Sequence, residues 1–328
     1  MRGMSLINLC CFVLLVFVLM TMAQGETAKP AAAASKAPWP QSVGVSVSSL
    51  ANPFFVALTR GAHERARQQN PAVKWIVRAA EYSVANQQAQ IQELIKLKVD
   101  VILLSASSEH ALEKVLLQAR KQGIVVIGVD VRATGAQQTV LTDNFAAGQL
   151  VCDYLARRIN GKGRVVIQNG PQVSSVIDRV AGCKQAWLNY PKIQLLSDKE
   201  NGDGSVWGGH TAMQAAISRY GELDAVFTIN DRQALGSVQA LQKAGHHKTR
   251  IGSVDGSHAV VQAIAGDSPI VVTASQSPRM IGQHAIEMAL ALHQGGAAEP
   301  ELLLLGTTLV TRDNASTFEA WDASATKE

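Results

Sequence analysis

Short apolar runs alternate with helix-like patterns along most of the chain. Valines alternate with small residues in residues 43–47, whereas residues 99–106 and 124–130 are almost continuously apolar, which is typical of strands buried on both faces. Between the runs, apolar residues recur at the spacing of one helix face. The expected strands are residues 43–47, 73–79, 99–106, 124–130, 140–141, 165–168, 193–196, 225–229, 250–254, 270–274, 302–305 and 308–310.

The helical patterns fall between these strands. The expected helices begin at residue 54 and then cover residues 87–97, 109–123, 145–159, 174–190, 206–220, 232–244, 258–266 and 278–294. Strict alternation of strand and helix predicts parallel sheets with helices on both faces. The pattern restarts near the middle of the chain, and 328 residues suffice for two domains of ordinary size. We therefore expect an α/β fold with two doubly wound parallel-sheet lobes.

The N-terminal region has the composition of a secretory signal peptide. Arg2 precedes an uncharged apolar run at residues 6–20, and a small-x-small cleavage site ends at Ala23. We expect residues 1–23 to be removed and residues 24–41, rich in Ala and Pro, to form a flexible lead-in. An uncleaved anchor is disfavoured because the run is short for a membrane span. A lipid-anchored form is disfavoured because the cysteines of this region lie inside the run.

Charge and motifs exclude several classes of function. The net charge is +4 and no dense run of Lys or Arg is present, so nucleic acid is not expected as a partner. The chain has no phosphate-binding loop, no G-x-G-x-x-G after a strand and no G-x-S-x-G elbow. His246 and His247 have no cluster of metal-ligating residues around them. We therefore expect no enzyme activity, no cofactor and no metal.

Cys152 and Cys183 are the cysteines that remain after signal cleavage. Secretion would place them in an oxidising compartment, where a bridge is allowed. Both fall in helical patterns whose separation the sequence does not give, so one disulfide or two buried thiols are both open.

Residues 43–61 bring polar and aromatic side chains to the end of a strand. Ser48 begins a polar loop, and Asn52, followed by a proline, has the preferences of a helix start. Phe54 and Phe55 open the helix. Open α/β sheets bind ligands at the carboxyl ends of their strands, so this segment is the first candidate for ligand binding.

The same segment resembles the first strand, loop and helix of periplasmic sugar-binding proteins of the ribose-binding type. Its S-x-x-x-N-P-F-F pattern is complete, and further matches are VDVILLSASS, VIGVD, LTDNFAAGQ, IDRVAG, AVFTINDRQALGSVQAL, IGSVDG and TASQSP. The resemblance covers residues 43–313. The ligand-binding residues that it implies are Ser48, Asn52, Phe54, Phe55, Ser105, Asp130, Arg179, Asn230, Asp255 and Gln276.

The resemblance also implies a hinge made of three chain crossings between the lobes. The expected crossings are near residues 142–143, 276–277 and 304–306. The expected domains are residues 42–142 with 277–304, residues 143–276 with 305–313, and a tail of residues 314–328.

The implied set has the chemistry that a sugar requires. Each sugar hydroxyl donates and accepts, and the planar groups of Asp, Asn, Gln and Arg supply directed partners. Phenylalanine rings suit the C–H face of a sugar. Asp130 and Asp255 end strands of different lobes, so a ligand that contacts both would bridge the cleft.

Each position also has a purely structural alternative. Asp130 suits the start of a turn, and the two phenylalanines suit the core of the first helix. Asn230 suits the N-cap of the helix that follows it, and Gln276 suits a similar capping role. Asp178 and Arg179 are candidates for a surface ion pair of little energetic worth.

Several residues depart from the ribose-binding pattern. Val131 stands where that pattern has arginine, and Val254 where it has phenylalanine. Gly204 stands where a further ring would stack, with Trp207 either replacing that ring or packing in the core. These departures predict a ligand other than ribose, such as a bulkier sugar, a polyol or a related polar molecule.

Taken with the signal peptide, the resemblance implies a monomeric periplasmic solute-binding protein. Such a protein closes its lobes on a sugar or polyol and delivers it to an ABC-type membrane permease. The alternative is a periplasmic sensor that presents its closed form to a chemoreceptor or a sensor kinase. An intracellular sugar-responsive repressor is disfavoured because no helix-turn-helix precedes the first strand.

Overall fold

The computed structural model describes residues 38–297 and 299–323. The predicted signal peptide, its cleavage site and most of the predicted lead-in lie outside these residues. Within the described ranges, no helix combines the length and apolar character needed to cross a membrane.

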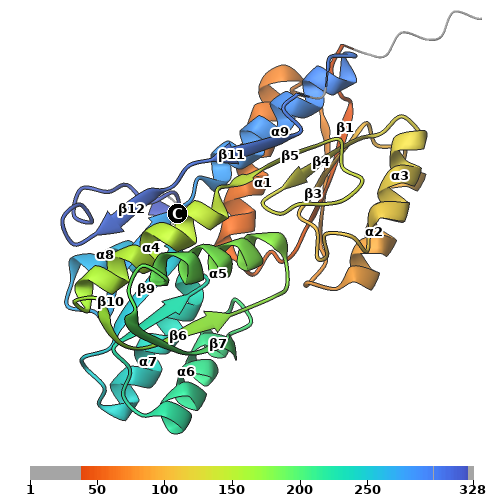
Figure 1. Cartoon of the computed structure of the whole chain (residues 1–328). Helices are drawn as coiled ribbons and strands as arrows, with labels where there is room; N and C mark the ends of the chain where they lie inside the picture. Colours follow the sequence, from red (N-terminus) through yellow and green to blue (C-terminus); the bar gives the residue numbers. More distant parts are fainter. Residues whose placement is uncertain (1–37, 298, 324–328) are drawn as a thin grey trace, which may run out of the picture. The chain divides into compact units, whose positions relative to one another are not determined.

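Two six-stranded sheets form the framework (Figure 1). The first has the order β11-β5-β4-β3-β1-β2, and all of its strand pairs are parallel. Its strands are β1 (Ser42–Val47), β2 (Lys74–Ala79), β3 (Val101–Leu104), β4 (Val125–Val129), β5 (Gln138–Thr142) and β11 (Leu302–Leu305).

The second sheet has the order β12-β10-β9-β8-β6-β7 and is parallel except for β12, which runs antiparallel to β10. Its strands are β6 (Lys162–Asn169), β7 (Lys192–Asn201), β8 (Ala225–Thr228), β9 (Arg250–Asp255), β10 (Ile270–Ser275) and β12 (Thr308–Thr311). The predicted α/β class with two parallel-sheet lobes is therefore confirmed.

The helices lie between successive strands, as the alternating pattern predicts. They are α1 (Pro53–Gln69), α2 (Val84–Lys96), α3 (Glu113–Lys121), α4 (Asn144–Arg158), α5 (Ser174–Trp187), α6 (Val206–Tyr220), α7 (Asp231–Ala244), α8 (His258–Ala265) and α9 (Pro278–His293). The helix expected from residue 109 begins only at Glu113, because the preceding residues form a turn.

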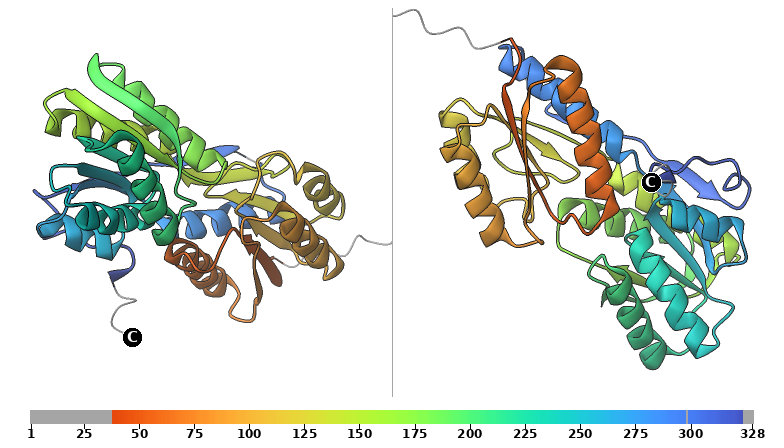
Figure 2. Two further views of the ribbon diagram at one scale, coloured as in Figure 1. Left: turned by 90° about the horizontal axis from the view of Figure 1, so that it is seen from below. Right: turned by 180° about the vertical axis from the view of Figure 1, so that it is seen from behind.

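Helices cover both faces of each sheet because alternate strand residues point to opposite sides. On the first sheet, Val43 and Val45 pack with α1 and α9, whereas Ile102 and Leu104 pack with α2 and α3 (Figure 2). On the second sheet, Val166 packs with α6, α7 and α8, while its neighbours in β6 face α4 and α5. At their carboxyl ends, the central strands continue into loops.

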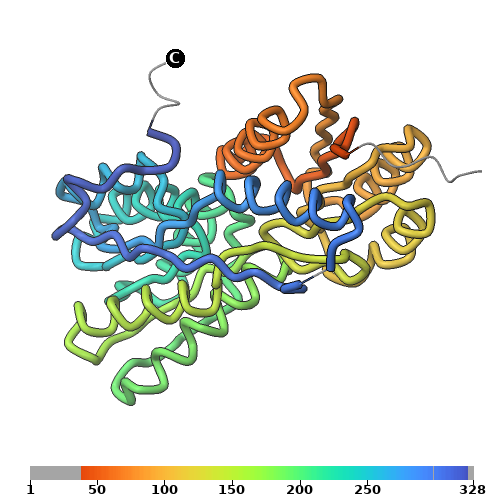
Figure 3. The backbone as a smooth tube through the Cα atoms, turned by 90° about the horizontal axis from the view of Figure 1, so that it is seen from above, coloured from red at the N-terminus to blue at the C-terminus, as the bar shows by residue number. Residues whose placement is uncertain are grey.

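The described chain passes from one sheet to the other after β5, after β10 and between β11 and β12. Figure 3 shows the last passage as the dark blue extended segment. At the first two passages, Thr142 Oγ1 donates a hydrogen bond to Gln276 Oε1 at 2.7 Å. The residue boundaries of the lobes stay a prediction.

A disulfide joins Cys152 in α4 to Cys183 in α5, which resolves the question that the sequence leaves open. The two helices pack with their backbones in close approach. A Cβ atom on Gly148 would lie 2.0 Å from Arg179 O, so only glycine fits there. The α4–α5 pair therefore fixes the backbone of a candidate ligand-binding residue, Arg179.

Replacing both cysteines, Cys152→Ser with Cys183→Ser, should lower the free energy of unfolding by about 3–4 kcal/mol. The bridge closes a loop with a sequence separation of 31 residues, and its loss restores conformational entropy to the unfolded chain. Urea unfolding measures this free energy for the variant and for the oxidised and the reduced wild type. Equal midpoints for all three would contradict a stabilising bridge.

Candidate functional site

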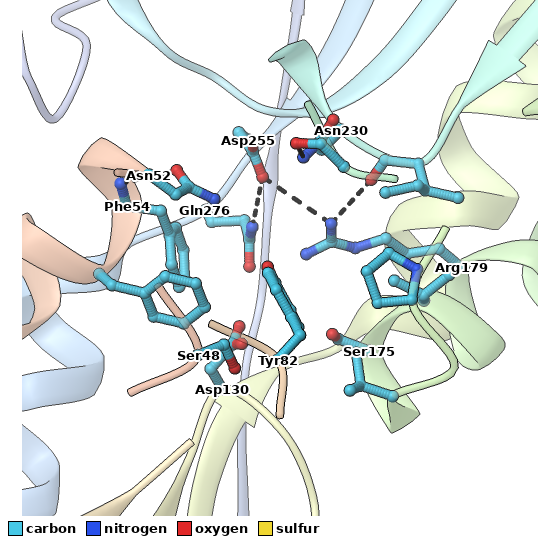
Figure 4. Close-up of a pocket in the computed structure, with 16 residues that line it drawn as sticks. Ser48, Asn52, Phe54, Tyr82, Asp130, Ser175, Arg179, Asn230, Asp255 and Gln276 are labelled. Atoms are coloured by element: carbon cyan, nitrogen blue, oxygen red, sulfur yellow. Dashed lines mark hydrogen bonds and ion pairs between the residues drawn. The ribbon is translucent and has the colours of Figure 1, made fainter. Parts of the chain in front are cut away.

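A pocket lies where the carboxyl ends of both sheets face each other (Figure 4). It encloses about 450 Å³ of space, part of it open to solvent. The sequence-predicted residues that line it are Ser48, Asn52, Phe54, Phe55, Asp130, Arg179, Asn230, Asp255 and Gln276. Both sheets thus contribute to one cavity, and Ser105 is the only predicted site residue outside its lining.

The loop after β1 supplies the apolar wall. Asn52 caps α1, and its Oδ1 accepts a hydrogen bond from Phe54 N at 3.1 Å. The Phe54 and Phe55 rings meet edge-to-face, with centroids 5.4 Å apart, and Trp321 packs edge-on behind Phe54. Both phenylalanines are buried in the core of the first sheet and also line the pocket. Each ring therefore belongs to the core and to the pocket wall.

Asp130 follows β4 and has a left-handed backbone with φ of 67°. Its side chain is buried, and Ser105 Oγ donates to Asp130 Oδ2 at 3.5 Å, which is long for a hydrogen bond. The Ser105 hydroxyl in turn lies 3.3 Å from Ser48 Oγ. Ser105 therefore supports the pocket from behind.

Burial raises the pKa of Asp130 to about 6, and the Arg179 charge acts against this rise. The carboxylate is thus mainly ionised at pH 7 while accepting one weak hydrogen bond within the described residues. A buried anion with spare acceptor capacity is a suitable partner for hydroxyl donors of a ligand.

Arg179 on α5 supplies a buried cation. Its Nε donates to Asn144 Oδ1 and its Nη1 to Ile229 O, both at 2.8 Å. The same Nη1 lies 3.8 Å from Asp255 Oδ1. These contacts fix the guanidinium in the pocket wall, and the alternative of a surface pair with Asp178 is wrong.

Asp255 ends β9 and is also buried. Gln276 Nε2 donates to Asp255 Oδ1 at 2.7 Å, and Trp321 Nε1 donates to its backbone oxygen at 2.8 Å. Burial raises the pKa of Asp255, and the nearby Asp231 carboxylate raises it further. The capping role considered for Gln276 is not seen, because the N-cap of α9 is Ser277.

Asn230 caps α7 and also lines the pocket. Its Oδ1 accepts from Gln233 N at 3.0 Å, which caps α7, and its Nδ2 donates to Gly204 O at 3.0 Å. The side chain also lines the pocket. The neighbouring Asp231 points away from the lining and accepts hydrogen bonds from Ser253, Ser257 and Thr273, which ties the strand ends together.

Other lining residues were missed by sequence reasoning. They are Tyr82, Pro171, Val173, Ser175, Val176, Gly204 and Ile229. The sequence marks Gly204 only as a position that lacks a ring. Tyr82 follows β2 and Ile229 directly follows β8, so the strand-end rule that identified the others would have found both. The remaining residues belong to loops or to the first turns of α5, whose direction the sequence does not give.

Two expectations near the site are wrong. Trp207 neither replaces the missing ring nor packs in the core, since it is 76% exposed and stacks on His210. Asp178 pairs with Arg132 from the first lobe, with atoms 2.6 Å apart, rather than with its neighbour Arg179.

The site combines fixed donors, buried acceptors and aromatic faces. No group of three or more His, Cys, Asp or Glu residues suited to a metal occurs among the residues that the structure describes. The arrangement is therefore suited to holding a polar molecule through hydrogen bonds and ring contacts.

Comparison with known proteins agrees with this geometry. A curated relative, the ribose import binding protein RbsB of Bacillus subtilis, is 29% identical over 80% of this chain and 85% of its own length. The xylitol-binding protein of Mycolicibacterium smegmatis is 28% identical over 83% of this chain and 77% of its own. An ABC transporter solute-binding protein from Mycobacterium smegmatis, solved with bound glycerol, superposes with a TM-score of 0.79 at 29% identity. That structural match covers 84% of this chain and 96% of the solved chain.

The family model described as a periplasmic binding protein domain matches residues 43–297. This range includes strands of both sheets and all of the pocket lining, and it ends before β11 and β12. All three relatives named above are binding proteins by name, and RbsB and the solved protein are named as parts of transport systems. The chain belongs to the periplasmic binding protein family.

Proposed function

We propose that the protein captures a neutral sugar or polyol between its lobes and delivers it to an ABC-type permease in the periplasm. The observation that carries this proposal is that Asp130 from the first lobe and Arg179, Asn230 and Asp255 from the second line one pocket. A molecule with several hydroxyls is able to engage all of them at once.

The charge of the pocket favours a neutral ligand. Its wall holds two buried carboxylates, Asp130 and Asp255, against one guanidinium, that of Arg179. An added anion would face these two carboxyl groups in a poorly hydrated space, which is costly, and burial already raises the pKa of both. Hydroxyl groups instead donate to the carboxylates and accept from Arg179, while Phe54 or Phe55 covers the C–H face.

The relatives support the same class of ligand. One is named for ribose, one for xylitol, and a solved neighbour holds glycerol. The departures at Val131, Val254 and Gly204 remove one donor and two rings relative to the ribose-binding pattern. We therefore expect a sugar or polyol other than ribose as the preferred ligand.

Contacts between the lobes support capture by closure. Arg132 N donates to Ser174 Oγ at 2.7 Å, and the Arg132 guanidinium makes two hydrogen bonds to Asp178 across the lobes. Val131 and Val173 belong to one buried cluster. A ligand that bridges the lobes adds to these contacts only in the closed form, so it populates that form.

A thermal-shift panel tests the proposed ligand class. At a hundredfold excess over Kd, a bound ligand should raise Tm by roughly 5 °C. The panel pairs neutral compounds such as ribose, xylitol, glycerol and inositol with gluconate, glucuronate and amino acids. Shifts confined to acidic compounds, or none among neutral sugars and polyols, would contradict the proposal.

Asp130→Asn should weaken binding of the identified ligand by roughly 10- to 100-fold, because it removes an ionised acceptor. Since it also removes a buried charge, it should not lower Tm of the free protein. Asp267→Asn, at an exposed carboxylate, is the matched control. Isothermal titration compares the variants, and unchanged affinity of Asp130→Asn would remove this residue from the site.

Binding and stability should respond to pH in opposite directions. The pKa of Asp130 is about 6 in the folded protein, above its unfolded value, so its protonation stabilises the fold as pH falls below 6. Ligand hydroxyls need the ionised form, so the affinity should be roughly tenfold lower at pH 5 than at pH 8. Asp255, whose pKa is also raised, acts in the same direction. Titrations at several pH values measure this, and a flat profile would argue against ionised acceptors in the complex.

A further inference from the structure

Tyr82 is a pocket residue from an element that supplies no other wall residue. It lies in the loop between β2 and α2, and Figure 4 shows its ring standing between Asp130 and the side chains of Gln276 and Arg179. The hydroxyl points toward the second-lobe side of the pocket. A ligand that reaches both lobes must therefore lie alongside this ring.

The backbone that aims the ring is unusual. Glu81 and Tyr82 are consecutive non-glycine residues in the left-handed region, with φ of 50° and 55°. Such conformations cost about 1 kcal/mol or more per residue and persist only where surrounding contacts hold them. Those contacts are present: Tyr82 N donates to Ser48 O at 3.1 Å, and Ser49 Oγ donates to Glu81 Oε2 at 2.9 Å. The loop that carries Tyr82 is thus tied to the loop that carries Ser48.

The hydroxyl of Tyr82 has unused hydrogen-bonding capacity. Among the described residues, none forms a hydrogen bond with it, and the side chain is half-buried in the pocket wall. Burial and the carboxylates of Asp130 and Asp255 raise the pKa of the phenol, so it keeps its proton. The group is therefore a neutral donor directed into the space between two acidic walls.

The opposite wall is open where a ring would be expected. Gly204 lines the pocket, and a Cβ atom there would meet its nearest neighbours, Asn230 Nδ2 and Pro171 Cδ, only at 3.5 and 3.8 Å. Trp207 does not fill this space, since it is exposed. The aromatic residues of the pocket lining, Phe54, Phe55 and Tyr82, therefore all come from the first lobe.

We propose that Tyr82 determines which sugar or polyol the pocket accepts. Its ring restricts the ligand to compact molecules, such as five-carbon sugars and short acyclic polyols, and its hydroxyl donates a hydrogen bond to them. Six-carbon pyranoses would overlap the ring. This inference rests on the proposed function, because it names the ligand class of the same site.

Two variants separate the roles of the hydroxyl and the ring. Tyr82→Phe keeps the ring and should weaken binding of the best compact ligand roughly three- to tenfold, through loss of one hydrogen bond. Tyr82→Asn frees the space, and asparagine adopts the left-handed backbone readily, so the loop should fold. This variant should shift preference toward hexoses by on the order of tenfold or more. Tyr190→Phe is the matched control, because Tyr190 Oη donates to Asp153 Oδ1 outside the pocket.

Isothermal titration of all four proteins against glycerol, xylitol, ribose, arabinose, allose, galactose and myo-inositol gives a decisive result. Weakening in Tyr82→Phe with a changed ligand order in Tyr82→Asn supports the proposal, provided that Tyr190→Phe matches the wild type. Equal affinities and the same ligand order in all four proteins overturn the role of Tyr82 and leave the proposed function standing. No binding by any of the four rejects the proposed function itself, and the role of Tyr82 with it.

Discussion

The buried carboxylate of Asp255 is the constraint on which the rest of the pocket depends. A charge removed from water is strongly destabilising unless polar partners replace the water. Here Gln276 Nε2 provides a hydrogen bond at 2.7 Å, while the Arg179 guanidinium stands 3.8 Å away. Because Arg179 is itself held by Asn144 and Ile229 O, the positions of α4, α5 and the end of β8 are all coupled to this one carboxyl group.

The same carboxylate connects the pocket to the chain crossings. Gln276 donates to Asp255 and accepts from Thr142 Oγ1, so one amide side chain bridges the second lobe and the end of β5. Trp321 adds a further link, since its ring packs on Phe54 while its Nε1 bonds Asp255 O. Thr142, Gln276 and Asp255 therefore form one hydrogen-bonded chain from the end of β5 to the pocket wall.

Much of this organisation is predictable from sequence, and the failures have physical causes. Strand and helix periodicity is local, so it predicts both sheets, and the strand-end rule brings Asp130 and Asp255 to one pocket. Ser105 obeys the same rule but faces the back of Asp130, because side-chain direction at a strand end depends on the twist of the loop. The Cys152–Cys183 bridge depends on the packing of α4 on α5, which no local pattern contains. Trp207 was misplaced because helical spacing does not say which face of α6 meets the sheet.

Tyr82 shows how resemblance and geometry differ as guides. A family pattern marks only the positions where the family binds its ligand. A departure at such a position is therefore seen as a missing side chain. At Gly204 and Val254 the chain indeed has less side chain than that pattern, which by itself suggests a larger ligand. The ring of Tyr82 enters the pocket from the loop after β2, at a position that the pattern does not mark. Since the free volume depends on every wall, the losses on one side and the gain on the other must be counted together. The free volume therefore follows from both changes, and a count of the losses alone overstates the space left for a ligand.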